Sequence, residues 1–206
     1  MALRGIILEM LPSMWPMMVI IGVIVISLRL GYLLKQGKRI VIYKEVMSLI
    51  FIIYVLCLYY IVTYKNINYG GLNLVPFKEM FRYSFMSDKF IKNIIGNIVL
   101  FIPYGYFSSY FLNNKKFSFN LLLTLIVTLS IELVQYNIGR TFDIDDIILN
   151  VIGGVIGFIV YIALDAVKGR LPKFLKSDTF LNILSIVIVV ILIIYTFNIN
   201  VVAWFK

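Results

Sequence analysis

Long apolar stretches follow one another along the chain and are separated by short polar segments. Each stretch is close to the roughly 20 apolar residues that a helix needs to cross a bilayer. The fold class we expect is therefore all-α, a polytopic bundle of about six transmembrane helices. The pattern places these helices at residues 11–34, 46–64, 93–112, 119–138, 147–167 and 179–197.

The segments between the helices are too short to hold a soluble domain. We expect residues 1–45 to form a first transmembrane helix followed by a basic loop. Residues 46–198 form the main membrane domain, and residues 199–206 a short tail. No small-x-small cleavage pattern follows the first apolar stretch, so we interpret it as a retained helix.

Composition excludes a soluble globular protein and a disordered protein. Hydrophobic residues make up 62% of the chain and charged residues 14%, against roughly 45–50% and 25% in soluble domains. Disorder needs the opposite balance. The chain has no histidine, which excludes His-based catalysis and His-ligated metals, and a single cysteine, Cys57, which excludes an intramolecular disulfide.

The net charge of +9 is distributed unevenly along the chain. Ten basic residues lie in three short segments, 35–44, 113–118 and 168–176. The positive-inside rule places these segments in the cytoplasm, and segments 65–92 and 139–146 outside together with both termini. Because this rule explains the basic surplus, we expect the lipid bilayer as a partner and no nucleic acid.

Polar residues beside or within apolar helices are candidate functional residues, because they are costly in hydrocarbon. In the outer loop these are Asn73, Pro76, Phe77 and Arg82. Pro76 restricts the backbone and removes a hydrogen-bond donor. An alternative interpretation is a loop that lies on the lipid headgroups, with Phe77 and Phe81 inserted.

Two further clusters lie within predicted helices. Asn93 and Asn97 are spaced i, i+4 and share one helix face, while Pro103 further along should kink that helix or free carbonyls. The alternative for the amides is hydrogen bonding between helices. Glu132 and Gln135 lie near the outer end of the next helix, where a carboxylate needs a proton or a cation, and a structural ion pair with an arginine is the alternative.

The fourth cluster lies at the start of the fifth helix. Asp143, Asp146 and Asn150 are spaced i, i+3, i+7 and fall on one face, with Arg140 just before them. Simple helix capping is the alternative. We expect Arg140 to pair with an aspartate, and Asp145 to point away from this face and to matter less.

Under the expected topology all four clusters lie near the outer ends of helices. We therefore predict one polar pocket at the outer leaflet and no comparable pocket at the cytoplasmic side. Its surplus of carboxylates would bind a proton or a divalent cation. The candidate pocket residues are Asn73, Pro76, Phe77, Arg82, Asn93, Asn97, Pro103, Glu132, Gln135, Arg140, Asp143, Asp146 and Asn150.

Four sequence blocks, in this order, resemble the VanZ-like family of bacterial membrane proteins. They are Asn73-Leu-Val-Pro-Phe77, Asn97 to Gly105, Glu132-Leu-Val-Gln135, and Gly139 to Gly157. The resemblance runs from about residue 46 to 198, and the first helix departs from it as an addition. It implies a multi-pass protein of the bacterial plasma membrane with a role in the cell envelope. The family's named member is associated with low-level resistance to the glycopeptide teicoplanin.

Three functions remain open from the sequence. The first is an envelope protein whose outer pocket binds a lipid-linked or amphiphilic ligand, with Arg82 and Arg140 holding its anionic groups. The second is an outer-leaflet enzyme that uses paired carboxylates on a lipid-linked substrate, with or without a divalent metal. The third is a structural module that only contacts another protein. The sequence assigns no catalytic residue, metal ligand or cofactor.

Overall fold

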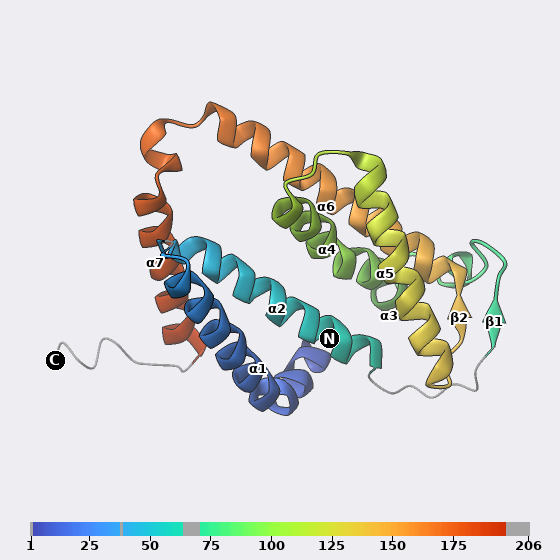
Figure 1. The fold of residues 1–206 in the computed structure, drawn as a ribbon. Helices are drawn as coiled ribbons and strands as arrows, with labels where there is room; N and C mark the ends of the chain where they lie inside the picture. The colour runs from blue at the N-terminus through green and yellow to red at the C-terminus, as the bar shows by residue number, and fades with distance from the viewer. Residues whose placement is uncertain (1, 38, 64–70, 197–206) are drawn as a thin grey trace. The chain divides into compact units, whose positions relative to one another are not determined.

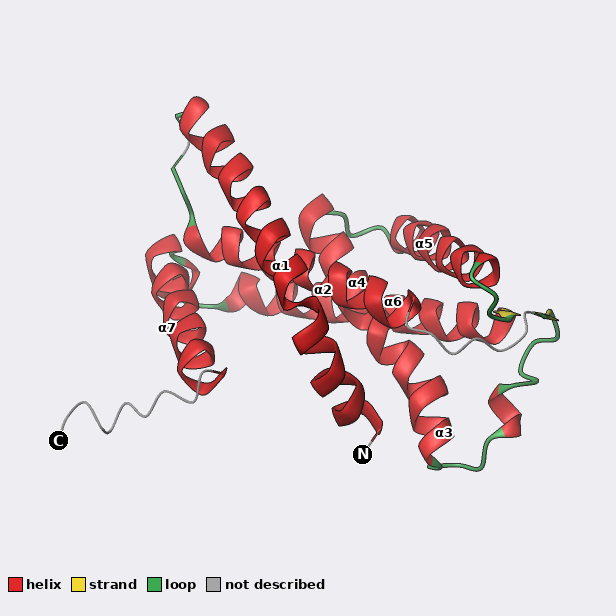
Figure 2. Ribbon diagram, turned by 90° about the horizontal axis from the view of Figure 1, so that it is seen from below, coloured by secondary structure: helices red, strands yellow, loops and turns green. Residues whose placement is uncertain are grey.

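The structure, a computed structural model, describes residues 2–37, 39–63 and 71–196. It consists almost entirely of helices (Figures 1 and 2). The long helices are α1 (Ala2–Lys35), α2 (Ile42–Thr63), α4 (Gly96–Leu112), α5 (Phe117–Asn137), α6 (Ile144–Arg170) and α7 (Asp178–Thr196). Short elements are β1 (Leu72–Asn73), a 3-10 turn (Met80–Arg82), α3 (Asp88–Phe90), a π-helix (Ile91–Ile95), β2 (Phe142–Asp143) and a second 3-10 turn (Lys173–Lys176).

The predicted all-α membrane fold is confirmed. Within the part of the chain that the structure describes, five helical segments are long and apolar enough to cross a membrane: Met14–Lys35, Ile42–Thr63, Asp88–Leu112, Phe117–Asn137 and Ile144–Arg170. The apolar part of α7 that the structure describes, Asp178–Leu192, is shorter. The predicted tail, residues 199–206, lies outside the described residues, and the predicted division at residue 45 stays a prediction.

The chain forms two compact units, which are described separately. One unit combines Met17–Ile53 with Val167–Lys206. Within it, Arg29 and Glu45 form an ion pair at 3.0 Å, which joins α1 to the first turn of α2. The backbone N–H of Tyr43 donates to the side-chain oxygen of Asn182 at 3.0 Å, which joins α2 to α7.

The other unit combines Met1–Pro16 with Tyr54–Ala166 and contains every candidate pocket residue. Its central contact is a close crossing of α4 and α6. A Cβ added at Gly105 would collide with the backbone of Gly154, and one at Gly157 would collide with the carbonyl of Ile102. Only glycine allows this approach of two helix backbones, which is typical of packing in lipid. Pro103 lies inside α4 beside this crossing.

Helix α5 buries polar residues instead of apolar ones. Its buried positions are all polar, and its apolar side chains are exposed or half-buried, as expected for a helix surrounded by lipid. The spacing of the buried residues places them on one helix face, which carries a polar stripe toward the α4–α6 pair. These residues are Asn120, Thr124, Thr128, Glu132 and Gln135.

A short pair of strands fixes the loop after α2 to the start of α6. β1 and β2 pair in parallel, with Leu72 opposite Phe142 and Asn73 opposite Asp143. The N–H of Phe142 also donates to the carbonyl of Gly71 at 2.9 Å. Residues about 70 positions apart are therefore held side by side at the end where α6 begins (Figure 1).

Candidate functional site

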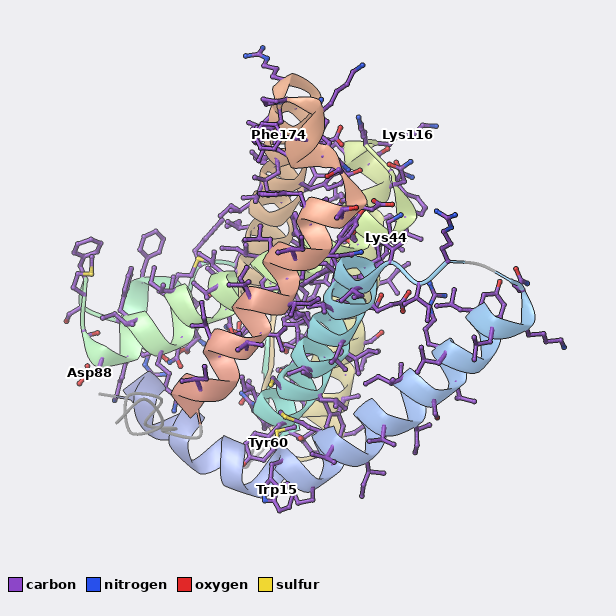
Figure 3. The ribbon with its side chains drawn as sticks, turned by 90° about the vertical axis from the view of Figure 1, so that its left-hand side faces the viewer. Trp15, Lys44, Tyr60, Asp88, Lys116 and Phe174 are labelled. Atoms are coloured by element: carbon purple, nitrogen blue, oxygen red, sulfur yellow. The ribbon has the colours of Figure 1, made fainter. Side chains whose placement is uncertain are left out.

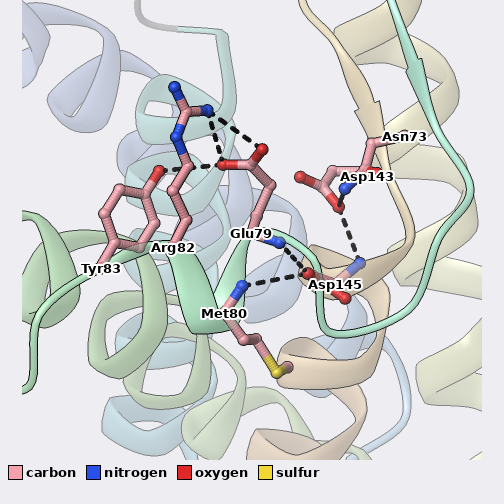
Figure 4. Close-up of polar contacts among 7 residues, drawn as sticks. All are labelled: Asn73, Glu79, Met80, Arg82, Tyr83, Asp143 and Asp145. Carbon is pink, nitrogen blue, oxygen red and sulfur yellow. Dashed lines mark hydrogen bonds and ion pairs between the residues drawn. The ribbon is translucent and has the colours of Figure 1, made fainter.

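Asp143 is the point at which the loop, β2 and α6 meet. Its Oδ1 accepts a hydrogen bond from the N–H of Asp145 at 2.9 Å, an arrangement that caps the start of α6. The same oxygen accepts from Nδ2 of Asn73 at 2.9 Å, as Figure 4 shows. Burial raises the pKa of the Asp143 carboxyl above its usual value, although these two donors oppose the shift.

Asp145 holds the loop from outside the predicted face. Its side chain is 1% exposed. One carboxylate oxygen accepts from the N–H of Phe77. The other accepts from the N–H groups of Glu79 at 2.8 Å and Met80 at 3.2 Å, as Figure 4 shows. Asp145 points toward the loop and not toward Asp146, and these contacts lead us to expect a larger role for it than the helix spacing suggested. The loop folds over the first turn of α6, and the spacing of residues along that helix does not reveal this contact.

Glu132 is only 1% exposed, and both of its carboxyl oxygens accept hydrogen bonds. Oε2 accepts from the N–H of Asp143 at 3.0 Å. Oε1 accepts from Nε2 of Gln135 at 2.9 Å, while Oε1 of Gln135 accepts from Nη1 of Arg140 at 2.7 Å; this amide orientation is the one that satisfies both neighbours. The Gln135 amide thus joins the guanidinium of Arg140 to the buried carboxyl group of Glu132.

Arg140 does not form the expected ion pair with an aspartate among the described residues. Its Nη1 donates to the carbonyl of Val62 at 3.1 Å, in the last turn of α2, in addition to its contact with Gln135. The carbonyls at a helix C-terminus carry partial negative charge and have no partner within the helix. Arg140 therefore fixes the end of α2 against the acidic groups.

Asp146 and Asn150 connect α6 to the two neighbouring helices. Nδ2 of Asn97 donates to Oδ1 of Asp146 at 2.5 Å, which connects α6 to α4. One turn deeper, Nδ2 of Asn150 donates to Oγ1 of Thr128 at 2.9 Å, which connects α6 to α5. Asn150 thus lies beside the network and bonds to the polar stripe.

We call two neighbouring groups together the acidic network. They are the hydrogen-bonded set Asn73, Glu132, Gln135, Arg140, Asp143 and Asp145, and the pair Asn97 and Asp146. Other candidates lie apart from it. Arg82 pairs with Glu79 at 3.2 Å, and its side chain is 69% exposed (Figure 4). Asn93 is half-buried in the π-helix, and Pro76 is exposed in the loop.

A second buried polar cluster lies at the opposite end of α4 and α5. Nδ2 of Asn120 is within 3.0 Å of the Gly105 carbonyl and the Ser108 hydroxyl, and within 2.9 Å of the Ser109 hydroxyl. This cluster consists of amide, hydroxyl and carbonyl groups, and the expectation of no comparable pocket at the cytoplasmic side stays a prediction. The four-residue spacing of Asn120 and Thr124 with the polar positions that follow could have revealed the cluster.

The acidic network contains four carboxylates and one arginine. Among the residues that the structure describes, no three carboxylate, cysteine or histidine side chains are grouped closely enough to hold a metal ion. A bound cation would therefore also use amide or backbone oxygens. One such oxygen is Oδ1 of Asn73, which is buried and accepts no hydrogen bond in the described part of the chain.

The chain matches the VanZ/LLP1 family over residues 51–165, which is more than half of its length. It belongs to the VanZ/LLP1 family. The expected family is confirmed, and the matched region contains the complete acidic network and leaves α1 outside.

One relative agrees with this membership. The chain is 26% identical over 170 residues to "Protein VanZ" of Enterococcus faecium, a similarity that covers 81% of this chain and 94% of that protein. No solved structure matches this member of the VanZ/LLP1 family. The family and the membrane helices together make the chain a multi-pass membrane protein.

Proposed function

We propose that this VanZ/LLP1 protein acts in the cell envelope, in the bacterial plasma membrane. In this proposal, the acidic network lies at the outer leaflet and binds a lipid-linked or amphiphilic envelope ligand. The observation that carries the proposal is the gathering of four carboxylates where the apolar helices α5 and α6 meet the loop after α2. Ionisable groups at membrane depth are costly and are retained for function.

The distribution of basic residues supports the outer placement. The α4–α5 connection, at the end opposite the acidic network, carries Lys115 and Lys116. Lys115 forms an ion pair with Asp165 near the other end of α6. Figure 3 shows Lys116 far from Asp88, the residue at which the α3–α4 segment begins. By the positive-inside rule, the lysine-bearing end is cytoplasmic and the acidic network is external.

The chemistry of the network favours a ligand with hydrogen-bond donors. Arg140 is engaged with Val62 and Gln135, so it is a poorer site for a phosphate than the sequence suggested. The carboxylates and the free Oδ1 of Asn73 are acceptors. They suit amine, hydroxyl or amide groups of a ligand whose apolar part contacts the exposed helix faces. Because of the family, teicoplanin susceptibility is the first phenotype to examine.

Complementation tests this proposal. A strain that lacks the gene is supplied with the wild-type protein, with Asp146→Asn, or with Asp88→Asn as an exposed carboxylate control. Asn at position 146 can still accept from Asn97, so the fold is expected to persist, as a matching elution profile in detergent would show.

We expect the wild-type and control proteins to change the teicoplanin inhibitory concentration and Asp146→Asn to lose that effect at equal expression. A wild-type phenotype for Asp146→Asn would contradict the proposed site. An inhibitory concentration that the wild-type protein does not change would contradict the teicoplanin phenotype.

A further inference from the structure

The segment between β1 and the π-helix exposes large apolar side chains. We call residues 74–92 the aromatic segment. Phe81 is 86% exposed and Phe85 is 78% exposed, and Leu74, Val75 and Met86 are exposed as well. The rings lie in pairs, with Phe77 and Phe81 6.3 Å apart. Large apolar side chains gathered and exposed in one short segment mark a site of contact with a partner or a membrane.

Hydrogen bonds fix the aromatic segment at the level of the start of α6. The carboxylate of Asp145, in the first turn of that helix, accepts from the N–H groups of Phe77, Glu79 and Met80. Since α6 is long and apolar enough to span a membrane, its first turn lies near a membrane surface. We therefore expect the aromatic segment at the interface between lipid and water.

The backbone of Phe77 has an unfavourable conformation, which its contact with Asp145 holds in place. Its φ of 67° is in the left-handed region, which is unfavourable for an aromatic residue. The N–H of Phe77 donates to Asp145 in this conformation, and the ring remains about half exposed. The fold thus maintains a strained loop that presents aromatic rings outward.

Basic residues alternate with these rings. Lys78, Arg82, Lys89 and Lys92 are exposed, and the aromatic segment contains only two acidic residues. Glu79, one of these acids, faces Arg82 within the segment. Aromatic rings combined with a positive surplus are the chemistry of segments that lie on anionic lipid.

We propose that the aromatic segment binds the anionic headgroup layer of the membrane, with Phe81 and Phe85 inserted among the acyl chains and the lysines at the phosphates. The segment thereby anchors the loop at the rim of the acidic network. This inference requires neither the outer orientation nor a ligand of the network, so it can fail while the proposed function stands.

The single natural cysteine makes the test direct. In a Cys57→Ala protein, a cysteine replaces Phe81, Phe85 or, as a control within the same segment, the exposed Ser84. Each cysteine carries a nitroxide label, and the full chain is placed in nanodiscs of phosphatidylcholine alone or mixed with phosphatidylglycerol. Collision of each label with oxygen and with a water-soluble nickel chelate reports its depth.

We expect labels at 81 and 85 to collide mainly with oxygen, and the label at 84 mainly with the chelate. Phosphatidylglycerol should shift the labels at 81 and 85 deeper, and neutralising Lys78 and Lys89 to Gln should abolish that shift. Labels at 81 and 85 as open to the chelate as the label at 84 would overturn the insertion. Equal depth in both lipid mixtures would overturn the anionic surface.

Discussion

The carboxylates of the acidic network differ in their hydrogen-bond partners, and therefore in how far the sequence reveals them. Asp143 and Asp146 could be placed from sequence, because the spacing of acids at a helix start is a local pattern. Asp145 could not, since its partners are backbone N–H groups 65 to 68 positions away, which carry no side-chain signature. For the same reason, the contact of Arg140 with a carbonyl of α2 was missed.

Replacing Asp145 tests the importance of these backbone contacts. Asp145→Asn removes one acceptor oxygen and turns an amide N–H₂ toward donors, so buried N–H groups lose their partner. We expect a loss of about 2–3 kcal/mol in the free energy of unfolding. Thermal unfolding of the protein in detergent measures this.

The matched control is Asp88→Asn, which changes an exposed carboxylate at the start of α3. We expect it to alter stability by less than about 1 kcal/mol. Equal stability of the two variants would show that Asp145 does not hold the loop.

Among the elements, the long helices were predictable and their connections were not. Six stretches of membrane length predict six helices, and each is present. Helix α6 begins at Ile144 and not at the predicted residue 147, because the side chain of Asp143 caps the helix there. The β1–β2 pair depends on two residues in each strand, too short for any periodic pattern.

The crossing of α4 and α6 predicts sensitivity to a single methyl group. Gly105→Ala would place a Cβ against the backbone of Gly154, so the helices must separate. We expect a destabilisation of about 2–3 kcal/mol. Gly31→Ala in α1, where a Cβ meets nothing within 4 Å, should be neutral or stabilising by up to about 1 kcal/mol. The unfolding midpoints of the two variants in detergent measure this difference. An unchanged midpoint for Gly105→Ala would argue against the close crossing of α4 and α6.

The polar stripe of α5 makes a separate prediction. Asn120→Ala removes the donor that joins α5 to the Gly105 carbonyl and to two serine hydroxyls of α4. Since such bonds contribute modestly in membranes, we expect a loss of about 1–2 kcal/mol.

Asn137→Ala is the control for Asn120→Ala. Asn137 is exposed, and among the described residues its side chain bonds only within its own helix, to the carbonyl of Leu133. Its replacement should change stability by less than about 0.5 kcal/mol. A larger effect for Asn137 than for Asn120 would contradict the role of the stripe in packing α5 against α4.

Across the whole molecule, hydrophobic lengths and basic loops set the expected arrangement in the membrane. The succession of long apolar stretches predicted a polytopic protein, and the four ordered blocks predicted the family. Because these blocks are far apart in sequence, the hydrogen bonds that join them had to come from the structure. Glu132 meets Asp143 across the turn after α5, and Asn97 meets Asp146 across 49 positions.

The outward orientation of the acidic network is the point on which the proposed function rests, and cysteine labelling in intact cells measures it most directly. In the Cys57→Ala protein, a cysteine at Ser84 lies on the network side and one at Lys116 on the lysine-bearing side. With a membrane-impermeant maleimide, we predict labelling of Ser84→Cys in intact cells, and of Lys116→Cys only after permeabilisation. Labelling of Lys116→Cys in intact cells, with Ser84→Cys protected, would contradict an external network.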